Sequence, residues 1–192
     1  VQGGICHLSE LASSLGIDYH AVAHILDILE GVFLLRRLPP YFADVGKRLV
    51  KSPKVYLRDT GVLHSLLDIP FRRRALLSHP KAGASFEGFC IEQVLLHAAA
   101  ADPSARGFFY RTHTGVEVDL ILEVRGRRIP VEVKLGLAPP DTRNLRRCME
   151  TLGLARGFVV NLSSEPVEIG RGIWMSGLRE FLEDVGLRPR GK

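Results

Sequence analysis

Acidic side chains and a lysine lie on two strand-like segments in the second half of the chain. Asp119 stands inside the apolar run 116–122, and Glu132 and Lys134 alternate with apolar residues over 129–135. Asp is a poor strand former, so its position within such a run needs an explanation. Side chains two positions apart on a strand project from the same face, so Glu132 and Lys134 should point the same way.

A hairpin would bring these side chains together. The turn-forming run Arg125-Gly126-Arg127 separates the two segments, and Glu132 lies thirteen positions after Asp119. Strict alternation places Asp119 on the same strand face as Glu117 and Ile121. A third carboxylate, Glu87, could come from the preceding helix. We therefore expect two or three carboxylates and a lysine to converge.

Such a cluster points to hydrolysis assisted by a metal ion. Like charges a few ångströms apart repel one another, and a divalent cation relieves that repulsion. Mg²⁺ and Mn²⁺ prefer carboxylate and water oxygens and could orient a water toward a phosphodiester. Lys134 could hold that water or stabilise the developing charge. The alternative is a solvated strand face that carries alternating charges.

The first sixty residues show two short amphipathic helices. Apolar residues recur at helical spacing over 8–15 and again over 22–29, with Gly16 placed to end the first helix and Asp18 to cap the second. Strand-like segments follow at 32–38 and 48–57, on either side of Pro39-Pro40. The pattern predicts a winged helix-turn-helix domain.

Positive charge is concentrated between the two ends of the chain. The net charge is +5, yet residues 36–81 alone carry eleven Lys and Arg against three Asp, which is +8. Counterion release on phosphate binding uses an excess of this kind, and a solvated linker is the alternative. The predicted nucleic-acid contacts are Arg36, Arg37, Lys47, Arg48, Lys51, Lys54, Arg72, Arg73 and Arg74.

The second half alternates between helical and strand patterns. A helix over 84–100 is followed by strands at 108–112, 116–124 and 128–135, a helix from Pro139 to about Leu152, and a strand at 157–162. The order α-β-β-β-α-β predicts a mixed α/β (α+β) architecture. We expect a winged-helix domain at 1–60, a basic connector at 61–81 and a second domain at 82–192.

Composition limits the class of protein. No apolar run approaches the roughly 18 residues of a membrane helix, so we expect no membrane span. Three scattered cysteines suggest neither a disulfide framework nor a zinc site, and no signal peptide is visible, so we expect a cytoplasmic protein.

Glu87, Asp119 and Glu132-Val133-Lys134, on helix, strand and strand, resemble the PD-(D/E)xK nuclease superfamily, which includes restriction endonucleases. The resemblance implies a restriction-endonuclease-like domain in which Asp119 and Glu132 hold the metal, Lys134 assists catalysis and Glu87 completes the site. Glu92 lies on the same helix and could replace Glu87. Val118 stands where that superfamily usually has proline.

A second resemblance covers nearly the whole chain. The runs 49–56 and 59–61, Phe86-Glu87-Gly88-Phe89, 117–119 and 131–134 are similar to the C-terminal region of a prokaryotic family of predicted AAA+ ATPases. That family implies a winged helix and a nuclease-like domain after an ATPase. No G-x-x-x-x-G-K loop occurs here, so we expect the ATPase upstream of Val1.

These observations predict an Mg²⁺- or Mn²⁺-dependent deoxyribonuclease module that uses water as the nucleophile and has no ATPase activity of its own. The alternative is a non-catalytic module that binds nucleic acid or protein and regulates or targets the ATPase. DNA is the expected partner, and a homo-oligomer is compatible with the sequence.

Overall fold

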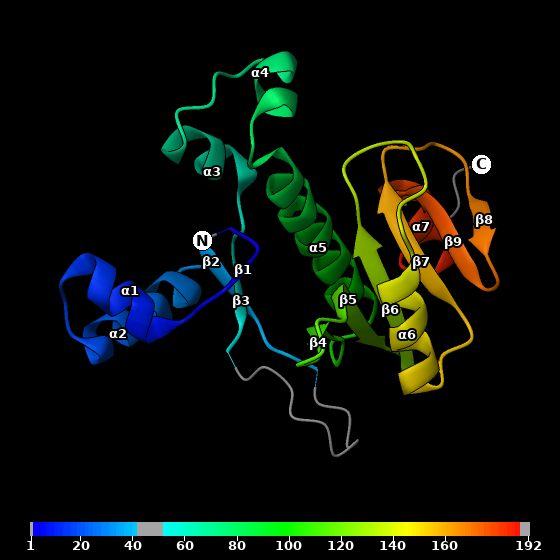
Figure 1. The fold of residues 1–192 in the computed structure, drawn as a ribbon, viewed down its shortest axis with the longest axis horizontal. Helices are drawn as coiled ribbons and strands as arrows, with labels where there is room; N and C mark the ends of the chain where they lie inside the picture. The colour runs from blue at the N-terminus through cyan, green and yellow to red at the C-terminus, as the bar shows by residue number, and fades with distance from the viewer. Residues whose placement is uncertain (1, 42–51, 189–192) are drawn as a thin grey trace. The chain divides into compact units, whose positions relative to one another are not determined.

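A computed structural model describes residues 2–41 and 52–188 (Figure 1). Within these residues the chain forms two compact units. The first contains the described residues up to Pro39 and those from 52 to Phe89, and the second contains Pro40, Tyr41 and the described residues from Cys90 on. The boundary falls inside helix α5 (Ala82–Ala101), which begins in one unit and ends in the other.

The first unit opens with the helix pair that the sequence predicted. Helix α1 spans Leu8–Leu15 and α2 spans Tyr19–Gly31. Gly16 adopts φ 66°, a left-handed conformation that favours glycine, and ends α1. Asp18 caps α2 by accepting a hydrogen bond from the backbone N–H of His20 at 2.7 Å. Both predicted helix boundaries are confirmed.

A small antiparallel sheet packs beside this pair. Strands β2 (Leu35–Leu38) and β3 (Lys54–Leu57) pair with each other, and β1 (Gly4–Ile5) adds to the other side of β3, giving the order β1-β3-β2. The two strands are shorter than the sequence pattern predicted, and β1 was not predicted. Apolar side chains from helices and sheet form the core: Cys6, Ala12, Val22, Leu26, Leu35 and Val55.

Two short helices occupy the segment that was predicted to be a connector. Helix α3 spans Thr60–Leu66 and α4 spans Arg73–Ser78. Asp59 caps α3 by accepting hydrogen bonds from the N–H groups of Gly61 at 2.6 Å and Val62 at 3.1 Å. The basic segment is therefore folded where the structure describes it.

The second unit is built on a mixed six-stranded sheet in the order β4-β5-β6-β7-β9-β8. Strands β4 to β6 are antiparallel, β6, β7 and β9 run parallel, and β8 is antiparallel to β9. The bounds are Arg106–Arg111 for β4, Glu117–Val124 for β5, Arg127–Val133 for β6, Gly157–Asn161 for β7, Val167–Gly170 for β8 and Ile173–Gly177 for β9.

Helices cover both faces of this sheet. Neighbouring residues of a strand point to opposite faces, and on β7 Phe158 packs edge-on against Phe181 of α7 (Leu178–Asp184), whereas Val159 shares a core cluster with α6 (Arg143–Leu152). Figure 1 shows α6 and α7 on either side of the sheet. The site-bearing strands β5 and β6 are thus held in the centre of a layered unit.

The described residues form an α+β protein with two sheets, as the sequence predicted. The predicted order α-β-β-β-α-β corresponds to α5, β4, β5, β6, α6 and β7, while β8, β9 and α7 were not predicted. Among the described residues no helix is both long enough and apolar enough to cross a membrane.

Candidate functional site

The β5–β6 hairpin brings the two strand carboxylates to adjacent places. Val124 pairs with Arg127 across a two-residue turn, in which Arg125 (φ 50°) and Gly126 (φ 69°) are both left-handed, as a type I′ turn requires. The ladder continues to the pair Leu120 and Val131 and ends there. Asp119 and Glu132 are the next residue on each strand.

Asp119 lies at a β-bulge. Phe108 pairs with Ile121 and Tyr110 with Val118, so Asp119 and Leu120 together face the single residue Phe109 of β4. An extra residue reverses the alternation beyond it, and a bulge can redirect a side chain. This explains why Val118 and Ile121 are both in the core cluster around α6. The strict alternation predicted from the sequence was therefore wrong at this point.

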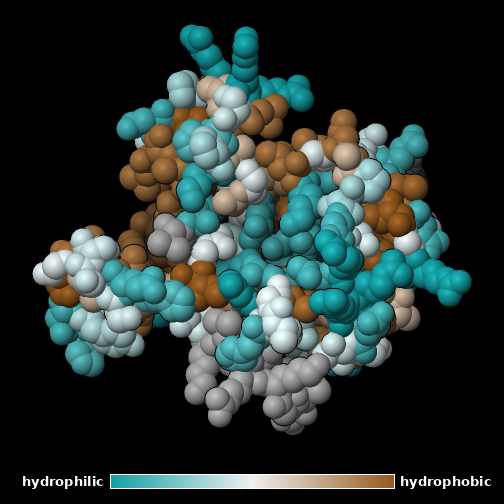
Figure 2. All heavy atoms as spheres, in the orientation of Figure 1, coloured by the Kyte–Doolittle hydropathy of each residue, from teal (hydrophilic) through white to brown (hydrophobic). Residues whose placement is uncertain are grey.

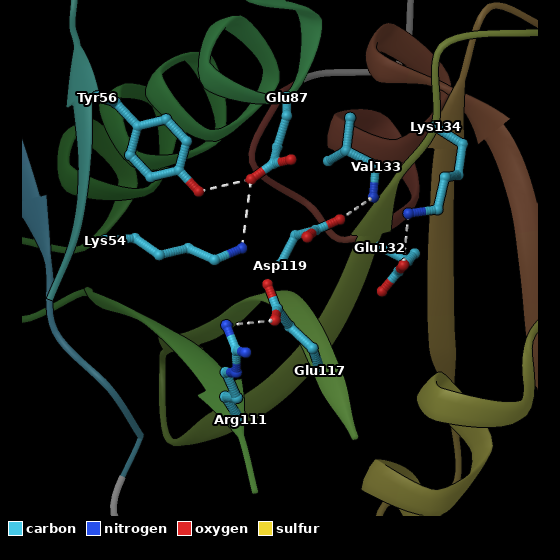
Figure 3. A network of polar contacts seen from close by, with 9 residues as sticks. All are labelled: Lys54, Tyr56, Glu87, Arg111, Glu117, Asp119, Glu132, Val133 and Lys134. Carbon is cyan, nitrogen blue, oxygen red and sulfur yellow. Dashed lines mark hydrogen bonds and ion pairs between the residues drawn. The ribbon is translucent and has the colours of Figure 1, made fainter. Parts of the chain in front are cut away.

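The Asp119 carboxylate is buried and held by the backbone of the next strand. The residue is 6% exposed, and its Oδ2 accepts a hydrogen bond from the N–H of Val133 at 2.9 Å (Figure 3). Because Val133 separates Glu132 from Lys134, this bond ties Asp119 to the middle of the Glu-Val-Lys run. The bond places Asp119 beside the backbone of that run.

Glu132 and Lys134 form an ion pair, with Lys134 Nζ 2.7 Å from Glu132 Oε1. The glutamate side chain is 12% exposed and the lysine side chain 45%, so the carboxylate is sheltered while the ammonium reaches solvent. The backbone N–H of Lys134 donates to the carbonyl of Val160 at 2.9 Å, which fixes the lysine beside β7. The two side chains therefore project together, as predicted.

Glu132 also faces a buried thiol on α6. Burial, and to a lesser extent the negative charge of Glu132, raise the pKa of the Cys148 thiol to about 12. A thiol with this pKa stays protonated at neutral pH when no metal ion is bound to it. The oxygen donors at this place are the carboxylates of Asp119 and Glu132.

The neighbouring carboxylate of β5 is engaged elsewhere. Glu117 Oε2 lies 3.2 Å from the Arg111 guanidinium, within a cross-strand pair of β4 and β5. Both side chains are partly exposed, at 40% for Arg111 and 30% for Glu117. Glu117 serves as an internal comparison for Asp119, since it lies two residues away on the same strand.

Glu87 is described within the first unit, where strand β3 holds its carboxylate. Tyr56 donates its hydroxyl to Glu87 Oε1 at 2.6 Å, and Lys54 Nζ lies 3.5 Å from the same oxygen (Figure 3). A side chain on Gly88 would come within 3.2 Å of the Tyr56 ring, so glycine at 88 leaves room for this contact. Lys54 and Tyr56 were not predicted to contact Glu87.

The donor set of the second unit fits a hard divalent cation. Among the described residues no group of three or more His, Cys, Asp or Glu side chains is arranged to hold a metal. Mg²⁺, however, is commonly bound through one or two carboxylates and keeps several waters. Asp119 and Glu132 supply two such carboxylates. Glu92, 6% exposed on the part of α5 in this unit, remains the alternative to Glu87 as a third.

The predicted nucleic-acid contacts differ in their surroundings. Arg37 is bound to α2, with its Nε 2.6 Å from Glu30 and its terminal nitrogen 2.7 Å from Asp27. Lys54 is 3% exposed, so it does not present its charge to a surface phosphate. The remaining described contacts are Arg36, half-buried on β2, and the exposed Arg72, Arg73 and Arg74; Lys47, Arg48 and Lys51 lie outside the described residues.

Comparison with known proteins gives a family but no activity. A model described as Domain of unknown function (DUF8612) matches residues 1–73, and one described as Domain of unknown function (DUF4143) matches residues 82–181. No solved structure matches the chain.

Two relatives are similar along most of the chain. "Uncharacterized protein Mb2031c" of Mycobacterium bovis and "Uncharacterized protein Rv2008c" of Mycobacterium tuberculosis are each 41% identical over 152 residues, which is 79% of this chain and 33% of the relative. The chain thus spans about a third of the length of these curated relatives. Since the second family model covers more than half of the residues, the chain belongs to the family described as Domain of unknown function (DUF4143).

Proposed function

We propose that the second unit is a PD-(D/E)xK-type nuclease module that hydrolyses DNA phosphodiester bonds with Mg²⁺ or Mn²⁺. The observation that carries the proposal is the meeting of Asp119 with the Glu132-Val133-Lys134 run at the end of the β5–β6 ladder. Asp119 sits at a bulge, which suits an active site because a bulge can direct one side chain out of register.

Each side chain has a role that follows from its position. Asp119 and Glu132 would hold the cation, which supplies charge stabilisation at the phosphoryl group and an activated water. Lys134 is the exposed cationic member of the group, so its ammonium would orient the attacking water or neutralise charge on the phosphate oxygens. The water oxygen forms a bond to phosphorus, one phosphorus–oxygen ester bond breaks, and the departing oxygen takes a proton.

We further propose that the first unit is a winged helix and that the full protein carries an AAA+ ATPase. The helix pair α1–α2 followed by the β2–β3 hairpin supports the first assignment. The relatives are about three times longer than the matched region, which leaves room for another domain. In the complete protein, the ATPase would act on DNA that the two units bind.

The test is cleavage of supercoiled, branched and single-stranded DNA in Mg²⁺, in Mn²⁺ and in EDTA. Wild-type protein should cleave only with a metal. Asp119→Asn should abolish cleavage because it removes a metal-binding charge, while its amide oxygen can still accept from Val133. Lys134→Ala should slow cleavage by roughly 10²-fold, a typical cost of losing one charge-stabilising group.

Glu117→Gln is the matched control, because it removes a carboxylate from the same strand that is paired with Arg111 and is not one of the proposed metal ligands. It should cleave as fast as wild type. Equal cleavage by Asp119→Asn and wild type, or cleavage that persists in EDTA, would contradict the nuclease proposal.

A second function is favoured by the apolar surface of the first unit. Ile28, Val32 and Phe33 are 50%, 56% and 72% exposed, an unusual density of apolar side chains around the end of one helix. A non-catalytic module that binds nucleic acid or protein and targets the ATPase would use such a surface. Binding without cleavage by the wild-type protein would favour this function.

A further inference from the structure

Phe71 is the most exposed large apolar side chain among the described residues. Its relative exposure is 105%, so its ring contacts almost nothing in the folded chain. Phe33, at 72%, differs because the Arg58 guanidinium lies over its ring, 5.2 Å from the centroid. Phenylalanine is normally among the most buried residues, and the full exposure of this one leaves the face of its ring open to a ligand.

Three arginines follow this ring in the chain. They are Arg72, Arg73 and Arg74, and all three are exposed. The segment 69–81 contains no acidic residue. Over α3 and α4, at the top of the view, hydrophilic side chains project beyond a hydrophobic surface (Figure 2). An aromatic face and a cluster of guanidinium groups are therefore presented together.

A cavity of about 360 Å³ adjoins the ring within the first unit. Phe71, Arg72 and Arg73 line this cavity together with residues of α3, α4 and the segment between them. These further lining residues are Thr60, Gly61, His64, Ile69, Pro70 and Leu76. His64 is held in place by a 2.7 Å hydrogen bond with Ser85. The cavity provides an apolar surface bordered by two arginines.

We propose that Phe71 and Arg72–Arg74 form a binding site for single-stranded DNA, with an unpaired base stacked on the Phe71 ring and the neighbouring phosphates bound by the arginines. The inference rests on the proposed function, because it names the form of DNA that the nuclease module would receive. Every base has a flat face that an aromatic ring can stack on, and guanidinium groups suit the backbone phosphates. In a duplex those base faces are covered by neighbouring pairs.

The test measures binding of a fluorescent oligothymidine and of a duplex by anisotropy. All variants carry Asp119→Asn, and the buffer contains EDTA, so that no cleavage interferes. Phe71→Ala should weaken single-strand binding by about 5- to 150-fold, the equivalent of about 1–3 kcal/mol for one stacked base. Phe71→Tyr should bind as the parent does, and duplex binding should not change in either variant.

Loss of an arginine should affect DNA binding differently from loss of Phe71. Arg73→Ala should weaken binding of both DNA forms and lower the slope of log affinity against log salt by about one phosphate contact. Leu66→Ala, which shortens another apolar side chain that is 69% exposed, is the control and should leave binding unchanged. Polyglutamate should displace the labelled oligothymidine less effectively than unlabelled oligothymidine of equal charge does, because it offers charge to the arginines but no base to Phe71.

The inference is overturned if Phe71→Ala binds the single strand as tightly as the parent, if Phe71→Tyr loses as much affinity as Phe71→Ala, or if duplex binding falls equally. Displacement by polyglutamate as effective as that by unlabelled oligothymidine of equal charge would also overturn it, in favour of an acidic protein partner. Because cleavage is switched off, these outcomes are independent of the nuclease proposal: cleavage of duplex by wild-type protein with failed single-strand binding would reject only this site.

Discussion

At the scale of single residues, the candidate site depends on the buried carboxylate of Asp119. Asp119 is 6% exposed and accepts a hydrogen bond from Val133, next to the sheltered Glu132. A buried carboxylate such as that of Asp119, and a largely sheltered one such as that of Glu132, are costly without compensating positive charge. Lys134 supplies one charge through its ion pair with Glu132. In the proposed nuclease a divalent cation would supply the rest.

Cys148 provides a pH-dependent test of this environment. Burial raises the pKa of its thiol from 9.0 to about 12, so between these values the folded chain keeps a proton that the unfolded chain loses. Stability from this thiol is complete below pH 9 and falls as pH rises toward 12. Relative to Cys148→Ala, wild type should lose about 1 kcal/mol of unfolding free energy near pH 10.

Urea unfolding of the two proteins, at about pH 8 and about pH 10, measures this loss. The comparison cancels the titration of other groups, provided that both proteins unfold in two states. An unchanged stability difference between the two pH values would contradict the buried, protonated thiol.

At the scale of elements, local patterns predicted the helices and the hairpin but not the contacts between distant segments. The turn at Arg125-Gly126 and the cap at Asp18 are local features, and both are present. The bulge at Asp119 depends on pairing with Phe109 of β4, which no local pattern encodes. Likewise β1 has two residues and forms only because β3 accepts it.

The same distinction applies to the candidate site. Glu132 and Lys134 could be placed on one face because they are two apart on a strand, and their ion pair confirms it. The hydrogen bond from Tyr56 to Glu87 joins residues 31 positions apart, on a strand and a helix. An alternating strand pattern would have shown that Lys54 and Tyr56 share a face but not which carboxylate they meet.

Two glycine-to-alanine substitutions test how helix α5 packs. Gly83 lies on the exposed surface of α5, and Gly107 lies on strand β4, where Leu95 of α5 packs against it. In Gly107→Ala the new methyl carbon would lie 2.5 Å from Leu95 Cδ2 and 3.2 Å from Leu120 Cδ1. Overpacking of this kind should lower the unfolding free energy by about 1–3 kcal/mol. Gly83→Ala meets no atom within 4 Å and should raise it by about 0.4–1 kcal/mol.

Urea unfolding again gives the measurement. Opposite signs for the two alanines are the expected result, because both remove glycine entropy from the unfolded chain and only Gly107→Ala creates a clash. A Gly107→Ala protein as stable as wild type would show that α5 does not pack on β4 as described.

At the scale of the whole molecule, the net charge of +8 over residues 36–81 overstates how many positive side chains could contact a phosphate. Arg37 is held by acidic groups of α2 and Lys54 is buried against Glu87. Within this segment, the described arginines that remain exposed are Arg72, Arg73 and Arg74. Nucleic-acid binding should therefore depend on Arg72–Arg74 far more than the charge total of the segment suggests.

The net charge of +5 also makes metal binding a sharp test, because a basic chain attracts cations only at a local acidic site. Isothermal titration of the whole chain with Mn²⁺ measures that site directly. Wild type and Lys134→Ala should bind the ion, and Asp119→Asn should lose binding, since the carboxylates hold the metal and the lysine does not. Equal Mn²⁺ affinity of wild type and Asp119→Asn would contradict the central claim.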